Sequence, residues 1–164
     1  MIQPIITIAT PSDAKDVRQV QHDTWIATYP NESLGITVDA IKKRIAAYIT
    51  TEKIEALKKS LIDPQQRTWI ATINSATIGY CTASTAEDNN RLEALYVLPA
   101  YQGMHVGKAL IEPALTWMGE TKPIELEAAS YNQQALSFYK KYGFKLTNWI
   151  GDNAGIPTVF LIKQ

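Results

Sequence analysis

The chain has 164 residues, of which 46% are hydrophobic and 20% charged, proportions that suit one folded domain and exclude a disordered or collagen-like protein. Sixteen basic and sixteen acidic residues give a formal net charge of zero, so bulk electrostatics attracts neither nucleic acid nor an anionic membrane. The lone cysteine, Cys81, excludes an internal disulfide and a cysteine-built zinc site. The N-terminus lacks the basic start and apolar run of a secretory signal. We therefore expect a single cytoplasmic domain over residues 1–164.

The first half of the chain predicts a strand, a series of helices and a hairpin. Apolar residues recur at helical spacing before residue 61, and from Thr68 the period changes to two. Thr51 can cap a new helix, so the second helical region is expected to break there. Asn74–Ser75 is expected to form the turn of the hairpin. The expected elements are a strand at 5–9, a helix at 13–29, two helices within 38–61, and strands at 68–73 and 77–84.

The second half predicts strands that alternate with helices. Pro113 lies within one helix and should bend it, whereas Gly143 supplies the left-handed stop of the next. A loop rich in Gly, Asp and Asn separates the last two strands. The expected elements are a strand at 92–97, a helix at 105–118, a strand at 124–128, a helix at 132–142, and strands at 144–149 and 158–162. This order predicts a mixed α/β (α+β) domain.

The stretch Leu92–Leu110 combines a strand, a short turn with glycine, and the start of a helix. Such a turn directs several unpaired backbone N–H groups at one place, where the helix dipole adds positive potential. The sequence therefore predicts an anion site that suits a pyrophosphate and needs no metal.

Together with Asn132–Phe144, which reads N-Q-Q-A-L-S-F-Y-K-K-Y-G-F, this stretch resembles the acyl-CoA-binding signature of the GNAT superfamily of N-acetyltransferases. The resemblance covers almost the whole chain and is closest in pattern to the spermidine/spermine (polyamine) acetyltransferases. It implies a twisted, mostly antiparallel mixed sheet of six to seven strands with a splay, flanked by about four helices. It also implies acetyl-CoA as the acyl donor, no metal, and direct attack by an amine in a ternary complex.

The resemblance assigns the cofactor contacts to three segments. The backbone of the strand around Tyr96 would bind the pantetheine arm, the amides of the turn would bind the pyrophosphate, and the later helix would contact the cofactor arm. One residue departs from the pattern, because the family has glycine where this chain has His105. The residues so assigned are Leu95, Tyr96, Val97, Gln102, Gly103, Met104, His105, Val106, Gly107, Lys108, Asn132 and Phe138.

The resemblance assigns the general acid to Tyr139. A phenol of pKa ~10 is protonated at neutral pH and can donate its proton to a thiolate leaving group, whose parent thiol has a pKa of about 8.5. Without the motif, a half-buried packing role would be the ordinary interpretation of this tyrosine.

The resemblance also suggests the base and the acceptor wall. Glu93 matches a glutamate that removes a proton from the amine in polyamine acetyltransferases, and an exposed strand glutamate is the alternative. Alternation along the strand predicts that Glu93 and Leu95 share a face. Trp25 and Tyr29, one helical turn apart, are expected to line the acceptor pocket, although core packing also suits Trp25.

The sequence leaves the acceptor open. Glu93 and the aromatic pair favour a polyamine or another small primary amine, with a protein N-terminus, a lysine or an aminoglycoside-like compound as alternatives. A non-catalytic acyl-CoA sensor is the rival from another class, and His105 is its best argument. The glycine turn comes too late for a dinucleotide-binding fingerprint, and two distant histidines form no recognisable metal-ligand set. The last two strands would be the contact surface of a homodimer.

Overall fold

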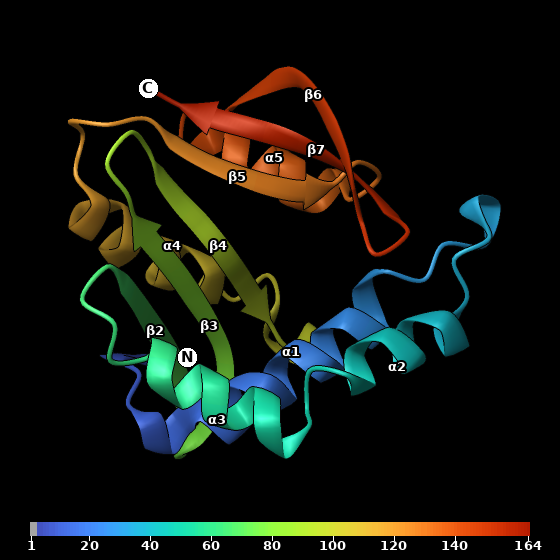
Figure 1. The fold of residues 1–164 in the computed structure, drawn as a ribbon, viewed down its shortest axis with the longest axis horizontal. Helices are drawn as coiled ribbons and strands as arrows, with labels where there is room; N and C mark the ends of the chain where they lie inside the picture. Colours follow the sequence, from blue (N-terminus) through green and yellow to red (C-terminus); the bar gives the residue numbers. More distant parts are fainter. Residues whose placement is uncertain (1–2) are drawn as a thin grey trace.

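The computed structural model describes residues 3–164, which form a seven-stranded sheet and five α-helices (Figure 1). The strands are β1 (Ile5–Ile8), β2 (Gln66–Ile73), β3 (Ala76–Thr85), β4 (Asn90–Val97), β5 (Ile124–Ala129), β6 (Lys145–Asn153) and β7 (Ile156–Lys163). The helices are α1 (Ala14–Thr28), α2 (Val38–Ala46), α3 (Thr51–Ser60), α4 (Val106–Met118) and α5 (Gln133–Lys141). The expected order of elements and the mixed α/β class are confirmed.

The sheet has the order β1-β2-β3-β4-β5-β7-β6 and is antiparallel except where β4 meets β5. These two parallel strands pair over only three residues each, Asn90–Leu92 with Ile124–Leu126. Beyond this point they diverge toward α1, as Figure 1 shows. The expected splay is therefore present, and it opens the middle of the sheet.

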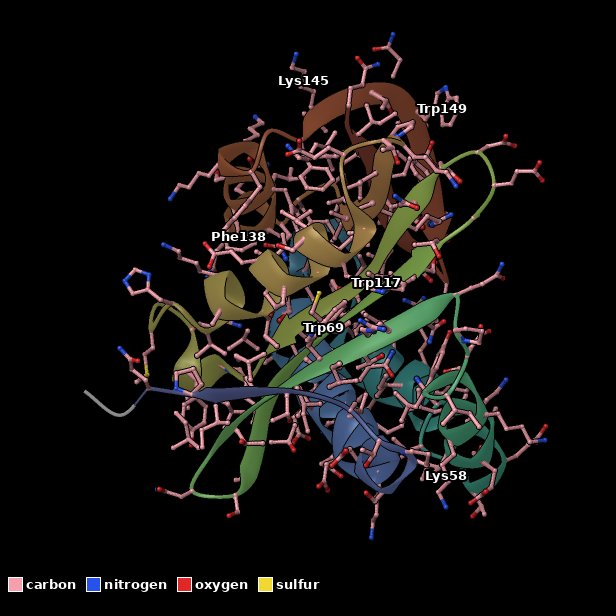
Figure 2. The ribbon with its side chains drawn as sticks, turned by 90° about the vertical axis from the view of Figure 1, so that its left-hand side faces the viewer. Lys58, Trp69, Trp117, Phe138, Lys145 and Trp149 are labelled. Atoms are coloured by element: carbon pink, nitrogen blue, oxygen red, sulfur yellow. The ribbon has the colours of Figure 1, made fainter. Side chains whose placement is uncertain are left out.

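Two layers of helices cover the sheet. One face packs against α4 and α5 in a core that includes Leu110, Leu126 and Phe144. The other face packs against α1, α2 and α3 in two smaller cores, one of which contains Trp25. Trp69 of β2 and Trp117 of α4 lie 5.9 Å apart between ring centroids, and Figure 2 shows them next to each other where α4 crosses the sheet.

Two local expectations need correction. The region 38–61 forms two helices, as expected, but the second is capped by Thr50 rather than Thr51. The loop expected between the last strands is mostly strand, because β6 and β7 pair up to Asn153–Ile156. Their turn is reduced to Ala154–Gly155, both with positive φ, which is the geometry of a tight hairpin.

Other local expectations are confirmed. Asn74 and Ser75 both have positive φ in the β2–β3 turn, and Gly143 ends α5 in the left-handed region with φ 88°. Pro113 lies within α4, as expected. Within residues 3–164, no helix is both long and apolar enough to cross a membrane.

Candidate active site

The splay between β4 and β5 opens into a cavity of about 730 Å³. Its wall is formed by the end of α1, β4 from Leu92 onward, the turn before α4 with the start of that helix, the end of β5, and α5. The sequence-predicted residues that line it are Tyr29, Glu93, Leu95, Tyr96, Val97, Gln102, Gly103, His105, Val106, Gly107, Lys108, Asn132, Phe138 and Tyr139. Fourteen of the predicted residues are thus brought to one place.

The strand wall is the part of β4 that has no partner on the β5 side. Pairing with β5 stops at Leu92, whereas β4 continues to Val97. Its open edge has the length and hydrogen-bonding groups to receive an extended ligand as an additional strand would be received. Gln102 Nε2 donates to the Val97 carbonyl oxygen at 3.0 Å and so ties the following turn back to the strand.

The turn before α4 and the first turn of that helix line the cavity. Gly103 (φ 78°) and His105 (φ 62°) are both left-handed, and His105 is the N-cap residue of α4. The first intrahelical bond here is from Ala109 N to His105 O, so the amides of the first turn remain available to an anion. Lys108 and Lys141 add positive charge to the cavity wall. Met104 differs from the expectation: its side chain is exposed, and it is not among the lining residues.

The helix α5 contributes the opposite wall. Asn132 caps it, accepting a hydrogen bond from Ala135 N at 3.1 Å through its side-chain oxygen. A Cβ at Gly107 would lie 3.6 Å from the Phe138 ring, so the start of α4 and the middle of α5 face each other closely.

Tyr139 lies at the inner end of this wall. Its side chain is 9% exposed and packs at 5.5 Å from Phe138 and 5.9 Å from Phe144, measured between ring centroids. Burial raises the pKa of the Tyr139 phenol, and the neighbouring Cys81 and Tyr96 add to the rise. The hydroxyl therefore keeps its proton at neutral pH, as a general acid must.

A second, smaller cavity of about 190 Å³ adjoins the first on the α1 side of the sheet. Trp25 from α1 and Tyr29, which caps the end of that helix, meet Tyr96 from β4 here, and the Tyr29 and Tyr96 hydroxyls are 3.2 Å apart. Burial raises the pKa of both tyrosines. The expected acceptor residues thus lie together, with Trp25 also packed in the core, as its alternative interpretation predicted. The full lining is Trp25, Tyr29, Arg91, Leu92, Glu93, Tyr96, Glu127, Ala128, Ala129, Asn153, Ile156 and Thr158.

Glu93 lines both cavities, but its carboxylate already has two neighbours. Ser84 Oγ donates to its Oε1 at 2.6 Å, and Arg91 Nε lies 3.7 Å from its Oε2. The pairing register of β3 with β4 shifts at this point. Ala83 pairs with Leu92 and Thr82 pairs with Ala94, so Glu93 has no partner in β3.

The register shift makes Glu93 the extra residue of a β-bulge. Leu92 and Leu95 both belong to the core under α4. Ala83 of β3 faces that same core, so its neighbour Ser84 points to the opposite face, and Glu93 lies on that opposite face because it bonds to Ser84. The expectation that Glu93 and Leu95 share a face is therefore wrong, because the bulge interrupts the alternation.

Sequence reasoning missed Glu127, which also lines both cavities. It lies at the end of β5 that diverges from β4, and Thr158 Oγ1 donates a hydrogen bond to its Oε1. The alternation of Ile124, Leu126 and two glutamates along this strand was the available signal. Glu127 reaches the cavities because β4 and β5 separate beside it, and the sequence of β5 alone does not predict where they separate.

Two other residues with reactive side chains, His22 and Cys81, lie outside both cavities. His22 pairs with Asp23 at 2.8 Å on the surface of α1, and Cys81 is fully buried in β3, where burial raises its pKa. Among residues 3–164, no group of three or more His, Cys, Asp or Glu is arranged to hold a metal ion.

Comparison with known proteins identifies the family. Residues 16–144 match the model of the acetyltransferase (GNAT) family. The chain is 32% identical over 112 residues to the peptidyl-lysine N-acetyltransferase YjaB of Escherichia coli, covering 68% of this chain and 70% of that protein.

Solved structures share the fold. The PaiA N-acetyltransferase from Thermoplasma acidophilum, solved in complex with coenzyme A, matches with a TM-score of 0.78 and 23% identity over 98% of both chains. Ard1 from Thermoplasma volcanium matches with a TM-score of 0.70 and 20% identity, over 99% of this chain and 97% of that one.

These likenesses agree with the cavity. An open strand edge, a turn of left-handed residues at a helix N-terminus and two lysines suit the extended arm and the phosphates of coenzyme A. The chain therefore belongs to the GNAT acetyltransferase family and is an N-acetyltransferase that uses acetyl-CoA.

Proposed function

We propose that this protein acetylates a primary alkyl amine, which attacks acetyl-CoA directly while both substrates are bound. The observation that supports this most is the junction of the two cavities. Tyr139 lines the larger one, whereas Tyr29, Tyr96 and two carboxylates line both. A cationic amine in the small cavity would meet carboxylates and neutral hydroxyls and would lie beside the splay, where the thioester is expected.

Proton transfers accompany the reaction at both ends of the reacting bond. The amine nitrogen forms a bond to the thioester carbon while the carbon–sulfur bond breaks, and Tyr139 gives its proton to the departing sulfur. The proton that the nitrogen loses on becoming an amide restores the Tyr139 phenol, directly or through water. A carboxylate at the junction, Glu93 in the first instance, accepts a proton from the amine directly or through water. An alkylammonium has a pKa of about 10.4, so a free base is scarce at neutral pH and a carboxylate acceptor helps to generate it.

Two acceptor classes fit this chemistry. A polyamine or another small amine suits the size of the inner cavity, about 190 Å³, and its carboxylates. A lysine side chain also presents a primary amine on an alkyl stem, and the likeness to the peptidyl-lysine acetyltransferase YjaB favours it. A panel of spermidine, spermine, small amines, amino acids, N-terminal peptides and lysine peptides separates these classes.

The test is CoA release from acetyl-CoA with this panel, measured for the wild type and Tyr139→Phe. We expect Tyr139→Phe to lower kcat by about 10²-fold or more, because the sulfur loses its proton donor, with little change in the affinity for acetyl-CoA. Tyr142→Phe is the matched control, since Tyr142 also packs against Phe138 but lines neither cavity.

Equal kcat values for Tyr139→Phe and the wild type would refute the acid assignment. Binding of acetyl-CoA without CoA release across the whole panel would instead favour a sensor, in which the cavity holds the cofactor and no transfer follows.

A further inference from the structure

Gly151 on β6 lies beneath a hydrogen bond that joins two other strands. It pairs with Thr158 of β7, and Thr158 Oγ1 donates to Oε1 of Glu127 on β5. Phe160, the direct partner of Glu127 in the sheet, also lies close to Gly151. Three strands therefore converge on the Glu127 carboxylate.

Space, rather than backbone conformation, explains the glycine at this position. Gly151 is not among the residues with positive φ, so its backbone angles are open to other residues. A Cβ here would lie 2.8 Å from Thr158 Oγ1 and 3.3 Å from Glu127 Oε1. The first distance is too short for a real contact, so a side chain would rotate the Thr158 hydroxyl away and break its bond to Glu127.

Two carboxylates line the smaller cavity, where the acceptor is expected, and Glu127 is the one that forms no salt bridge with a basic residue. Glu93 is engaged by Ser84 and by Arg91, the only basic residue of that lining. Within residues 3–164, no salt bridge reaches Glu127. Thr158 occupies one of its oxygens, and the other oxygen remains for a donor. An ammonium ion is the donor that such a carboxylate prefers.

We propose that Glu127 binds the ammonium group of the acceptor, and that Thr158 and Gly151 are positioning residues that fix its carboxylate at the cavity wall. This inference rests on the proposed function, since it names the group that selects a cationic acceptor for that reaction. Glu127 discriminates between a charged amine and a neutral molecule of the same shape, and Thr158 restricts the carboxylate to one orientation.

The kinetic test separates KM for the amine from KM for acetyl-CoA. We expect Glu127→Gln and Thr158→Val to raise the amine KM by about tenfold, because each removes part of a charge-assisted interaction. Thr158→Ser retains the hydroxyl and should restore the wild-type amine KM. Gly151→Ala should behave like Thr158→Val. KM for acetyl-CoA should stay at the wild-type value in all four variants.

A control on the same hairpin excludes a general loss of stability. Thr147 Oγ1 donates to the Phe160 carbonyl at 3.1 Å and accepts from Trp149 N at 3.1 Å, and Thr147 lines neither cavity. Thr147→Val therefore also removes side-chain hydrogen bonds from the β6–β7 hairpin. We expect it to leave the amine KM unchanged. An equal rise in Thr147→Val and Thr158→Val, or a failure of Thr158→Ser to restore the value, would overturn the positioning role.

A binding measurement keeps this inference separate from the proposed function. The dissociation constant of n-butylamine is measured by NMR titration on the complex with CoA, which cannot react. We expect weaker binding in Glu127→Gln and Thr158→Val than in the wild type, and no preference over 1-butanol in Glu127→Gln. Equal constants in the three proteins, or no butylamine binding to the wild type, would overturn it. Failure of every amine to release CoA from acetyl-CoA would overturn the proposed function alone.

Discussion

At the scale of single residues, His105 has a backbone conformation that restricts which side chain is allowed. Its φ of 62° lies in the left-handed region, where glycine is unstrained, Asn, Asp and His are tolerated, and β-branched residues are rare. The departure from the family's glycine is therefore compatible with the turn. His105 is one of the lining residues of the cavity where the pyrophosphate is expected, beside the first turn of α4.

We expect His105→Val to lower the free energy of unfolding by about 1–2 kcal/mol, because a β-branched side chain opposes a left-handed backbone. The distorted turn should also weaken binding of acetyl-CoA. Urea denaturation and calorimetric titration with acetyl-CoA measure the two effects.

His105→Gly is the matched control, because glycine adopts the same angles without strain. Its stability should stay close to that of the wild type. If valine and glycine at this position gave the same stability, the backbone strain would not be what restricts the residue.

The site residues differ in how far the sequence could predict them. Tyr139, Phe138 and the turn from Gln102 belong to local motifs, whose geometry follows from a few consecutive residues. Glu127 reaches the acceptor cavity through strand pairing with β7 and through the splay, which are contacts between distant segments. The residues next to Glu127 in the sequence do not indicate these contacts, so its local pattern predicts only a glutamate within a strand.

At the scale of elements, the hairpin β3–β4 forms the wall along which the acyl donor is expected to lie. Gly79 of β3 faces Val97 of β4, and a Cβ at Gly79 would lie 2.8 Å from the backbone oxygen of Tyr96. A backbone atom cannot rotate aside, so any larger residue must push the two strands apart. The glycine thus keeps β3 and β4 at their normal distance and so fixes the position of β4, whose other edge is open.

We expect Gly79→Ala to lower the free energy of unfolding by about 1–3 kcal/mol, the usual cost of overpacking. The affinity for acetyl-CoA should fall as well, because the displaced segment includes Tyr96 and Val97. Thermal unfolding with and without acetyl-CoA measures both effects.

Gly107→Ala serves as a comparison, since its Cβ would meet the Phe138 ring at an ordinary 3.6 Å. It should be folded as stably as the wild type. A Gly79→Ala protein with unchanged stability and affinity would show that β3 and β4 adjust without loss.

Element boundaries show the same contrast between local and distant causes. The hydrophobic period located every strand, yet the loop expected after Trp149 is mostly part of β6 and β7. Gly151, Asp152 and Asn153 are typical loop residues, and the sequence favoured a loop for that reason. They pair with β7 instead, because a glycine at position 151 leaves room for the Thr158 side chain and because the turn occupies only Ala154 and Gly155.

At the scale of the whole molecule, the two edge strands of the sheet differ in how readily another chain could pair with them. The edge strand β1 has four residues, and a short edge strand limits pairing with another chain. The other edge, β6, has nine residues and exposes Leu146, Trp149 and Ile150, the last at 83%. Figure 2 shows Trp149 and Lys145 on the outer side of this hairpin. Three large apolar side chains on one edge strand form a patch rather than the scattered exposure of an ordinary surface.

The ends of β6 carry opposite charges, with Lys145 at its start and Asp152 near its end. Two copies related by a two-fold axis would place their β6 strands antiparallel, with each lysine opposite the aspartate of the other copy. The predicted homodimer would then cover the apolar patch. The bulge between Leu146 and Ile150 would favour contact through side chains over a continuous ladder of hydrogen bonds.

We expect Ile150→Lys to convert the dimer to a monomer, because it inserts a charge into the centre of the contact. The side chain is exposed in the single chain, so the free energy of unfolding of the monomer should change by less than about 0.5 kcal/mol. Ile62→Lys is the matched control, since Ile62 is 71% exposed but lies after α3, away from β6. Light scattering coupled to size-exclusion chromatography should give twice the mass of one chain for the wild type and Ile62→Lys, and the mass of one chain for Ile150→Lys. A wild-type protein that elutes as a single chain at high micromolar concentration would contradict the dimer.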